Sequence, residues 1–228
     1  AVTFIAFISS LSIQWLPLFS LTGGALAMLL LISFQHKGNL QPTTIVIIGI
    51  ALQTMFTALV NGLLIMTKQL SASKAYTWIV GSLSGATFDS SLILAIIILC
   101  VVPLLAIVIP RMKVSIMHDD VATGLGLNVN QTKLIQMLIT TILAASAISF
   151  VGNIGFVGLI SPHIAKTLIK TSYLKRLVMS AICGAASILL ADLVGRTIFL
   201  PKEVPAGVFI AAFGAPFFIY LLLTVKKI

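Results

Sequence analysis

The stretch SLILAIIILCVVPLLAIVI, Ser91–Ile109, decides the fold class because it holds no charged residue. A helix needs about 20 mainly apolar residues to cross the hydrocarbon core of a bilayer, and this stretch has that length. The whole chain of 228 residues is 59% hydrophobic and 8% charged, whereas soluble domains carry about a quarter charged residues. Its mean hydropathy is +1.18. The sequence therefore predicts an all-α, polytopic transmembrane helix bundle.

The same length criterion finds eight candidate crossings along the chain. They are Ala1–Ile13, Pro17–Phe34, Thr43–Met66, Ser91–Ile109, Leu134–Val151, Ile154–Ile169, Leu177–Val194 and Ala206–Val225. The first is apolar from its first residue and has no basic leader, so it is interpreted as an incomplete span and not as a signal peptide. The sixth is short and contains Pro162-His163, which predicts a broken or partly spanning segment. All eight are assigned to one domain, residues 1–228.

The basic residues predict how these segments are oriented. If the C-terminus is cytoplasmic, ten Lys and Arg residues lie on the cytoplasmic side and four on the other. The ten are Lys37, Arg111, Lys113, Lys133, Lys166, Lys170, Lys175, Arg176, Lys226 and Lys227; the four are Lys68, Lys74, Arg196 and Lys202. Because cytoplasmic loops are enriched in these residues, the sequence predicts a multi-pass protein of the cytoplasmic membrane with its C-terminus inside.

The net charge of +9 does not indicate a nucleic-acid partner. The basic residues form short runs between apolar segments, as topology determinants do. They form no basic stripe with exposed aromatic residues between its charges. Membrane lipid is the partner that this composition predicts.

The loop His118–Leu127 is the most informative inner loop. Asp119 or Asp120 can cap the start of a short helix, and Gly124 or Gly126 can end it in the left-handed conformation. Ala122 and the two glycines leave a helix face of little bulk, which could fit a groove on another protein. A plain surface helix between two spans is the alternative interpretation.

A second motif runs from Gly152 to His163 and holds glycines 152, 155 and 158 at a spacing of three. No Lys-Ser/Thr pair follows them, and the chain contains no GxxxxGK[ST] run, so we expect no phosphate-loop nucleotide site. The glycines are expected to permit a tight turn and close helix packing. His163 has no carboxylate or second histidine at ligand spacing, so a structural role is predicted for it and no metal site is expected.

A third motif is Leu190–Arg196, followed by Glu203-Val204-Pro205. Asp192 and Arg196 are four residues apart, so they share a helix face and can form an ion pair. Ionisable residues inside a span usually mark function. Asp192 is placed near the outer end of its helix, where the cost of burying a charge is smaller.

Together these motifs resemble the permeases of type II ABC importers, the FecCD group that carries iron-siderophores, haem and vitamin B12. The matching runs cover essentially the whole chain, and it is their combination that is specific. They are Trp78–Leu83, Asp119-x-x-Ala122-x-x-Leu125-Gly126, Gly155–Leu159 with Pro162-His163, Ser180-Ala181, Gly184-Ala185, Ala191-Asp192, Arg196, Glu203-x-Pro205-x-Gly207 and Gly214–Phe217.

The resemblance implies a fold of ten spanning helices, of which this chain would hold the last eight. It implies that Asp119, Asp120, Ala122, Gly124, Leu125 and Gly126 belong to a coupling helix that rests on a separate ATPase subunit. It implies that Arg196 docks a substrate-binding protein, and that Trp78, Gly81, Ser82, Glu203, Pro205 and Gly207 flank the translocation path. Gly155, Gly158, Pro162, His163 and Asp192 would be structural.

By the same resemblance the chain carries no catalytic residue and no cofactor, and ATP and Mg²⁺ belong to the partner ATPase. The other implied partners are an extracytoplasmic binding protein and a second permease, identical or related. The expected function is import of an iron-siderophore by alternating access, with vitamin B12 or haem as alternative cargo. An ion-gradient transporter is the rival class, and a membrane-embedded enzyme is disfavoured because no HExxH or GxSxG motif is present.

Some positions depart from the family pattern. Lys166 stands where the family often has Arg, Leu174-Lys175-Arg176 replaces an Asp-His-Arg turn, and Met179 replaces a common Pro. These changes lie in one inner loop and in the start of the following helix. They affect the expected detail of that loop and not the class of protein.

Overall fold

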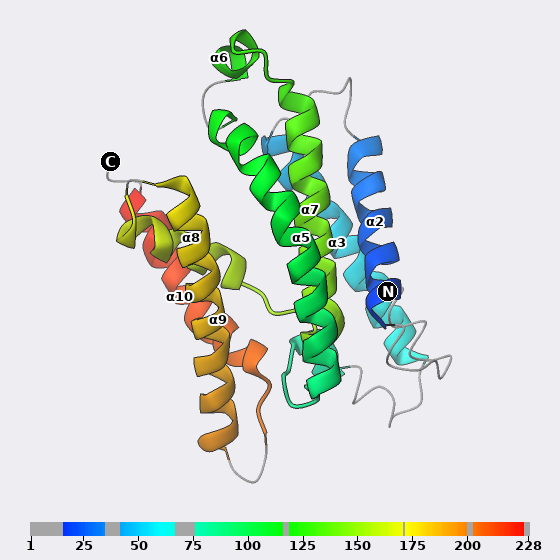
Figure 1. Cartoon of the computed structure of the whole chain (residues 1–228). Coiled ribbons are helices and arrows are strands. Elements are labelled where there is room, and N and C mark those ends of the chain that lie inside the picture. Colours follow the sequence, from blue (N-terminus) through cyan, green and yellow to red (C-terminus); the bar gives the residue numbers. More distant parts are fainter. Residues whose placement is uncertain are drawn as a thin grey trace. The chain divides into compact units, whose positions relative to one another are not determined.

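The computed structural model describes residues 16–34, 42–66, 76–115, 119–170, 172–199 and 203–225. Within these ranges the chain is helical apart from short connections and contains no strand (Figure 1). The helices are α2 (Leu16–Ser33), α3 (Pro42–Ile65), α5 (Phe88–Val114), α6 (Asp119–Gly124), α7 (Val129–Val151), α8 (Val157–Leu168), α9 (Tyr173–Thr197) and α10 (Ala206–Val225). The all-helical fold class is therefore confirmed, while the predicted span Ala1–Ile13 lies outside the described residues.

Helices α5, α7 and α9 extend further than the apolar runs that predicted them. Thr87 caps α5, because its side chain accepts a hydrogen bond of 3.3 Å from the Ser90 amide. Asp89 lies in the first turn of α5, and Arg111 and Lys113 lie in the last turn. These charges complement the helix dipole at each end, so the helix continues past its apolar centre into polar sequence at both ends.

Four of these helices are long and apolar enough to cross a membrane. They are the helices at residues 43–65, 88–114, 129–151 and 173–197, and two shorter apolar helices occur at residues 18–33 and 206–220. Because a bilayer offers no water to unpaired backbone groups, helices are the form that such apolar sequence takes there. The chain is a multi-pass membrane protein.

The chain forms two compact units. The first comprises residues 1–75 and 87–150, with α2, α3, α5, α6 and α7. The second comprises residues 76–86 and 151–228, with α8, α9 and α10. The segment 76–86 thus belongs with the C-terminal helices, although it is joined in sequence to α5.

In the first unit, small and hydroxylated residues bring α2 against α7. A side chain added at Gly24 would lie 3.1 Å from Thr141 Cγ2 and 3.3 Å from Ala145 Cβ. The Ser20 hydroxyl donates a hydrogen bond of 2.6 Å to the Ala145 carbonyl oxygen. Small residues and interhelical hydrogen bonds hold membrane helices together where apolar burial does not drive association.

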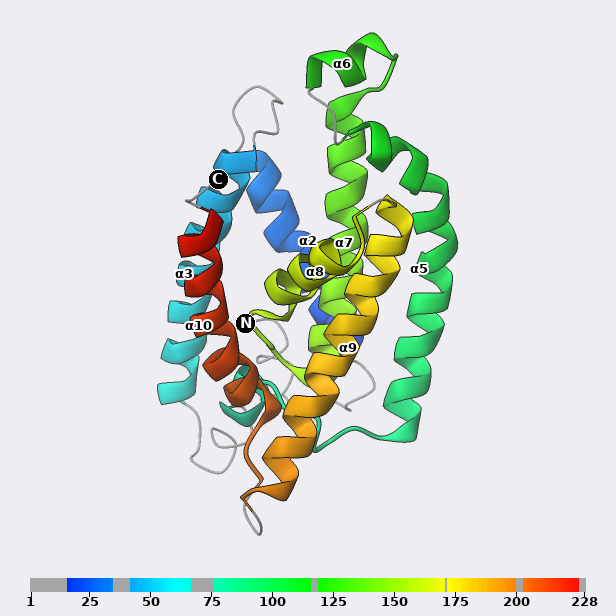
Figure 2. The same cartoon turned by 90° about the vertical axis from the view of Figure 1, so that its left-hand side faces the viewer.

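In the second unit, α8 is a short helix that packs on α9, and α10 packs on both (Figure 2). A Cβ at Gly184 would lie 3.2 Å from Ser161 Oγ, so the contact between α8 and α9 is close. With 12 residues, α8 is about 18 Å long at 1.5 Å per residue, too short to cross the hydrocarbon core. Of the two alternatives predicted for Ile154–Ile169, the partly spanning segment is the one observed, because α8 is short and continues through Pro162 without a break.

Candidate functional site

Three segments of the second unit meet through their backbones, and we call this meeting point the glycine junction. It consists of residues 76–86, 151–156 and 203–208. The Ser82 amide donates a hydrogen bond of 2.9 Å to the Val151 carbonyl, and the Gly207 amide donates one of 3.1 Å to the Gly81 carbonyl. Segments that are far apart in sequence are thereby joined without any side chain between them.

Two of the junction glycines adopt a backbone conformation that other residues rarely reach. Gly81 has φ +87° and Gly152 has φ +80°. Gly81 ends the single helical turn at residues 76–80, and its amide donates a hydrogen bond of 3.1 Å to the Thr77 carbonyl. Glycine is favoured here because a Cβ destabilises the left-handed region.

Close approach is a second reason for glycine at the junction. A Cβ on Gly152 would overlap the Trp78 carbonyl oxygen, and a Cβ on Gly207 would overlap the Val80 carbonyl oxygen. A Cβ on Gly81 would lie 2.7 Å from Ile154 Cγ1. The short backbone distances therefore exist only because side chains are absent at all three positions.

An apolar core lies beneath the junction. Ala191, Ala206 and Ile210 are buried together. Of these, Ala206 belongs to the junction segment 203–208. The partly buried residues packed against this core come from the other two segments of the junction and from the neighbouring helices: Leu83, Ile154, Phe156, Val157, Ile188 and Phe209. Backbone contacts and side-chain packing thus fix the same three segments.

The residues predicted to flank the path lie in this junction. Gly81 and Gly207 are in direct contact, while Glu203 is exposed, and Trp78, Ser82 and Pro205 are half-buried. The Ser82 hydroxyl lies 2.9 Å from that of Ser84, within a turn closed by the Ala86 amide on the Leu83 carbonyl. Sequence reasoning missed Gly152 as a member, although its place at the head of the glycine motif was a signal.

The predicted ion pair between Asp192 and Arg196 is confirmed. The Arg196 Nε atom donates to Asp192 Oδ2 over 2.8 Å, and the arginine side chain is 43% exposed. Beside it, a Cβ on Gly195 would lie 2.5 Å from the Val204 carbonyl oxygen and 3.2 Å from the Phe209 ring. The end of α9 that presents Arg196 is thus held against the start of α10.

Phe156 is the non-glycine residue with a positive φ, +64°, in the described part of the chain. It caps α8, and the Ile160 amide donates to its carbonyl over 2.9 Å. A Cβ at Gly214 would lie 2.6 Å from Phe156 Cβ, so Gly214 on α10 provides the space for this residue. No local sequence pattern predicts this strained position.

The other residues of the glycine motif are less closely packed. Within the described structure, a Cβ at Gly155 or Gly158 would meet no heavy atom within 4 Å. Close packing therefore occurs at Gly152 and not at these two. His163 stacks edge-on against Phe217 with ring centroids 6.3 Å apart, a contact that suits a structural histidine, and Pro162 lies inside α8.

In the first unit, the predicted short helix is α6, which lies in the connection between α5 and α7 (Figure 1). The Leu127 amide donates to the Ala122 carbonyl over 3.1 Å, and the Gly126 amide donates to the Thr123 carbonyl over 2.9 Å. With Gly126 at φ +81°, these bonds form a Schellman motif. Of the two predicted helix-ending glycines, Gly126 is the one in the left-handed conformation.

The next turn fixes α6 to α7. The Asn128 side chain accepts a hydrogen bond of 3.1 Å from the Gln131 amide and so caps α7. Ala122 is fully buried, whereas Val121 is 49% exposed and Leu125 is 66% exposed. Gly124 and Gly126 are exposed as well. The surface that α6 offers to a partner is therefore centred on Val121 and Leu125, with Ala122 behind it; the side chains of Asp119 and Asp120 lie outside the described part.

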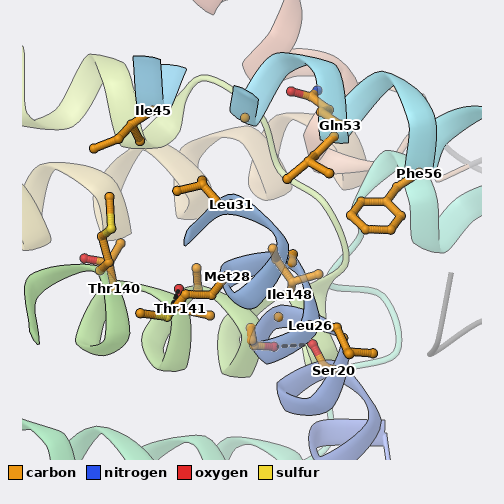
Figure 3. A pocket seen from close by; sticks show the side chains of 18 of the residues that line it. Ser20, Leu26, Met28, Leu31, Ile45, Gln53, Phe56, Thr140, Thr141 and Ile148 are labelled. Carbon is orange, nitrogen blue, oxygen red and sulfur yellow. Dashed lines mark hydrogen bonds between the residues drawn. The ribbon is translucent and has the colours of Figure 1, made fainter. Parts of the chain in front are cut away.

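A cavity of about 930 Å³ lies among α2, α3 and α7 of the first unit (Figure 3). It was not predicted from the sequence. Its wall is mainly apolar, with Leu26, Phe56 and Ile148 among the lining residues. Lys133, Gln136, Thr140 and Gln53 add polar groups.

Comparisons with known proteins cover nearly all of the chain. The model of the FecCD transport family matches residues 1–224. YfhA of Bacillus subtilis (strain 168), assigned to a siderophore transport system as a permease protein, is 37% identical over 213 residues, which are 93% of this chain and 62% of the relative. The achromobactin transport system permease protein CbrC of Dickeya dadantii (strain 3937) is 34% identical over 98% of this chain and 64% of the relative.

A third relative and a solved structure agree with these. The Fe(3+)-citrate import system permease protein YfmE of Bacillus subtilis (strain 168) is 37% identical over 91% of this chain and 62% of the relative. This chain thus spans less than two thirds of the length of these relatives. An inward-facing structure of a transporter assigned to the metal-chelate ABC type has a TM-score of 0.86 at 23% identity, over 97% of this chain and 72% of that one, which shows the fold.

The sequence motifs, the helical fold and these matches are consistent with one another. The resemblance drawn from the residues is confirmed over the length that the family model covers. The chain belongs to the FecCD transport family.

Proposed function

We propose that this chain is part of the membrane-spanning permease of an ABC importer that carries an iron-siderophore or a related metal chelate into the cytoplasm. The observation that carries the proposal is membership of the FecCD transport family over residues 1–224. The names of the relatives support the cargo class, because they refer to siderophore, achromobactin and ferric citrate systems. Vitamin B12 and haem are the alternative cargoes.

The mechanism we propose is alternating access driven by a separate ATPase subunit, which binds ATP and Mg²⁺. The exposed surface of α6 would receive the movement of that subunit. Its Schellman motif and the Asn128 cap tie α6 to the first turn of α7, so a push on Leu125 is transmitted to a membrane helix and is not absorbed by a loose loop. No bond in the cargo is made or broken on this chain.

Two further partners complete the proposal. Arg196 is half-exposed at the end of α9, and a substrate-binding protein with acidic residues would dock there. A second permease, identical or related, would form the path together with this chain. The excess of basic residues in the loops that share a side with the C-terminus supports a cytoplasmic C-terminus.

The positions of the acidic residues disfavour the rival class of ion-gradient transporters. The chain has five Asp and Glu residues: Asp89 in the first turn of α5, Asp119 and Asp120 at the start of α6, Asp192 near the end of α9, and Glu203 before α10. Carriers coupled to protons or sodium usually need such groups near the membrane midplane. Asp192 is already paired with Arg196.

Uptake in cells tests the proposal. The gene for the full-length protein is deleted in a strain that lacks its other permeases of this family, and radio-iron uptake is measured with catecholate, hydroxamate and citrate carriers under iron limitation. We expect at least a tenfold loss with one carrier, restored by the intact gene. If iron uptake is unchanged with every carrier, labelled cobalamin and haem decide between the alternative cargoes, and unchanged uptake of those as well would contradict the proposal.

A further inference from the structure

We infer that the glycine junction is a rigid unit, which we call the clasp. The predicted path residues Trp78, Ser82 and Glu203 would then move together as one body when the permease changes between its inward-open and outward-open states. This inference rests on the proposed function, because it concerns how the path opens. It adds Gly152 as a positioning residue that touches no cargo and holds the other segments in place.

The first support is that the contacts run from backbone to backbone. The Ser82 amide is bound to the Val151 carbonyl over 2.9 Å, and the Gly207 amide to the Gly81 carbonyl over 3.1 Å. Backbone groups have no rotamers, so these bonds cannot lengthen by turning a side chain. Gly81 and Gly207 are buried, so parting them would leave buried polar backbone groups unpaired.

The second support is the absence of free space at the contacts. Trp78 and Val80 place their carbonyl oxygens where a Cβ of Gly152 and of Gly207 would stand. Packed interfaces of this kind switch between discrete arrangements and do not deform continuously. A small slide of residues 76–86 along the start of α10 would meet these contacts at once.

The third support is the common core. Leu83, Ile154 and Phe209 belong to different segments of the junction and its neighbours, yet they pack on the same buried residues, Ala191, Ala206 and Ile210. Contacts within the chain also group residues 76–86 with residues 151–228. The junction is therefore fixed by hydrogen bonds, by close packing and by an apolar core together.

The alternative is a path that opens inside the junction, with residues 76–86 parting from residues 151–156 or from the start of α10. The two possibilities differ in what a covalent link across the junction does. A link within a rigid body leaves transport unchanged, whereas a link across a moving boundary stops it.

The test uses the complete importer in proteoliposomes, with Cys100 and Cys183, the free cysteines of the described structure, first replaced by Ser. Ser82→Cys and Val151→Cys are then combined, and the pair is closed by oxidation or by a short thiol cross-linker. We expect closure in most molecules and ATP-driven transport within twofold of the reduced protein. A tenfold loss on closure that dithiothreitol reverses would overturn the inference.

Glycine variants test the positioning role of Gly152 independently of cross-linking. Gly152→Ala places a methyl group against the Trp78 carbonyl at positive φ, while the matched control Gly155→Ala meets open space. At low temperature, where both variants are folded, we expect Gly152→Ala to lower the maximal transport rate at least tenfold with basal ATPase activity retained, and Gly155→Ala to stay within twofold. Equal rates for the two variants would contradict the role of Gly152.

Failure of this inference and failure of the proposed function give different results. If the unmodified importer moves no ferric chelate, the proposed function fails, but the extent of cross-linking and the thermal stability of the glycine variants still report on the clasp. If the importer is active and the closed pair is inactive, the clasp alone is wrong.

Discussion

The Gly207 amide, in the first turn of α10, donates a hydrogen bond of 3.1 Å to the Gly81 carbonyl. These two residues are far apart in the sequence, and both have close backbone neighbours that leave no room for a side chain. The contact places two of the predicted path segments, residues 76–86 and 203–208, against each other.

Gly207→Ala should destabilise the second unit, because the new methyl group overlaps the Val80 carbonyl oxygen. Overpacking costs about 1–3 kcal/mol, and a clash with backbone should lie at the upper end of that range. Thermal unfolding in detergent, followed by size-exclusion chromatography, measures the change. Gly158→Ala is the matched control, because its methyl group meets open space within α8, where Ala is favoured by up to about 1 kcal/mol. A Gly207→Ala protein as stable as that control would contradict the described contact.

Phe156 provides a test of backbone strain. At φ +64° a residue with a Cβ is disfavoured by about 1–2 kcal/mol relative to glycine. Phe156→Ala and Phe156→Gly both lose the ring that packs on the core, but only Phe156→Gly relieves the strain. We expect the glycine variant to unfold at a higher temperature than the alanine variant, the reverse of the order expected at an ordinary helical position. If the alanine variant instead unfolds at the higher temperature, Phe156 is not in the left-handed conformation.

Substitutions at Arg196 and Asp192 can distinguish an effect on docking of the binding protein from an effect on the stability of this chain. A partly exposed ion pair four residues apart on a helix contributes only about 0.3–0.5 kcal/mol, so neither Arg196→Gln nor Asp192→Asn should change the unfolding temperature appreciably. If Arg196 docks an acidic binding protein, Arg196→Gln should reduce ferric chelate uptake severalfold while Asp192→Asn does not. Uptake is measured at low and at high concentrations of the binding protein. If Arg196→Gln weakens docking, the loss of uptake should be smaller at the high concentration. A similar loss of uptake in both variants would mean that uptake depends on the Asp192–Arg196 ion pair and not on docking by Arg196 alone.

The exposed surface of α6 is the place to test coupling. Leu125→Glu adds a charge where we propose that the ATPase docks, whereas Asn130→Glu adds the same charge to an exposed position in the first turn of α7. We expect Leu125→Glu to reduce co-purification of the ATPase and uptake at least tenfold, with normal amounts of protein in the membrane. Asn130→Glu should have little effect. An unaffected Leu125→Glu importer would exclude α6 from the coupling contact.

Ala122 is a poorer position for that experiment than the sequence indicated. A face of small residues predicted that Ala122 would be presented to a partner, but its side chain is fully buried. A larger residue there would disturb the loop itself before any partner was met. Ala is common both on contact surfaces and in tight interiors, so the sequence pattern could not distinguish these two cases.

The sequence predicted the helices well because apolar runs of spanning length have few other solutions in a bilayer. The span Ala206–Val225 agrees with α10 residue for residue, and the Asp192–Arg196 pair follows from helical spacing. The glycine junction could not be predicted in the same way, because it joins three segments whose approach depends on tertiary packing. The left-handed Phe156 is likewise set by Gly214 on a different helix, which no local pattern reveals.

The most direct test of the proposed function is transport by the purified full-length importer in proteoliposomes. Labelled ferric siderophore is supplied with its binding protein, ATP is enclosed on the ATPase side, and proton and sodium gradients are abolished with ionophores. We predict accumulation that requires ATP, the ATPase subunit and the binding protein, and that persists without an ion gradient. Accumulation that needs a gradient and ignores ATP would contradict the assignment of this chain to an ATP-driven importer.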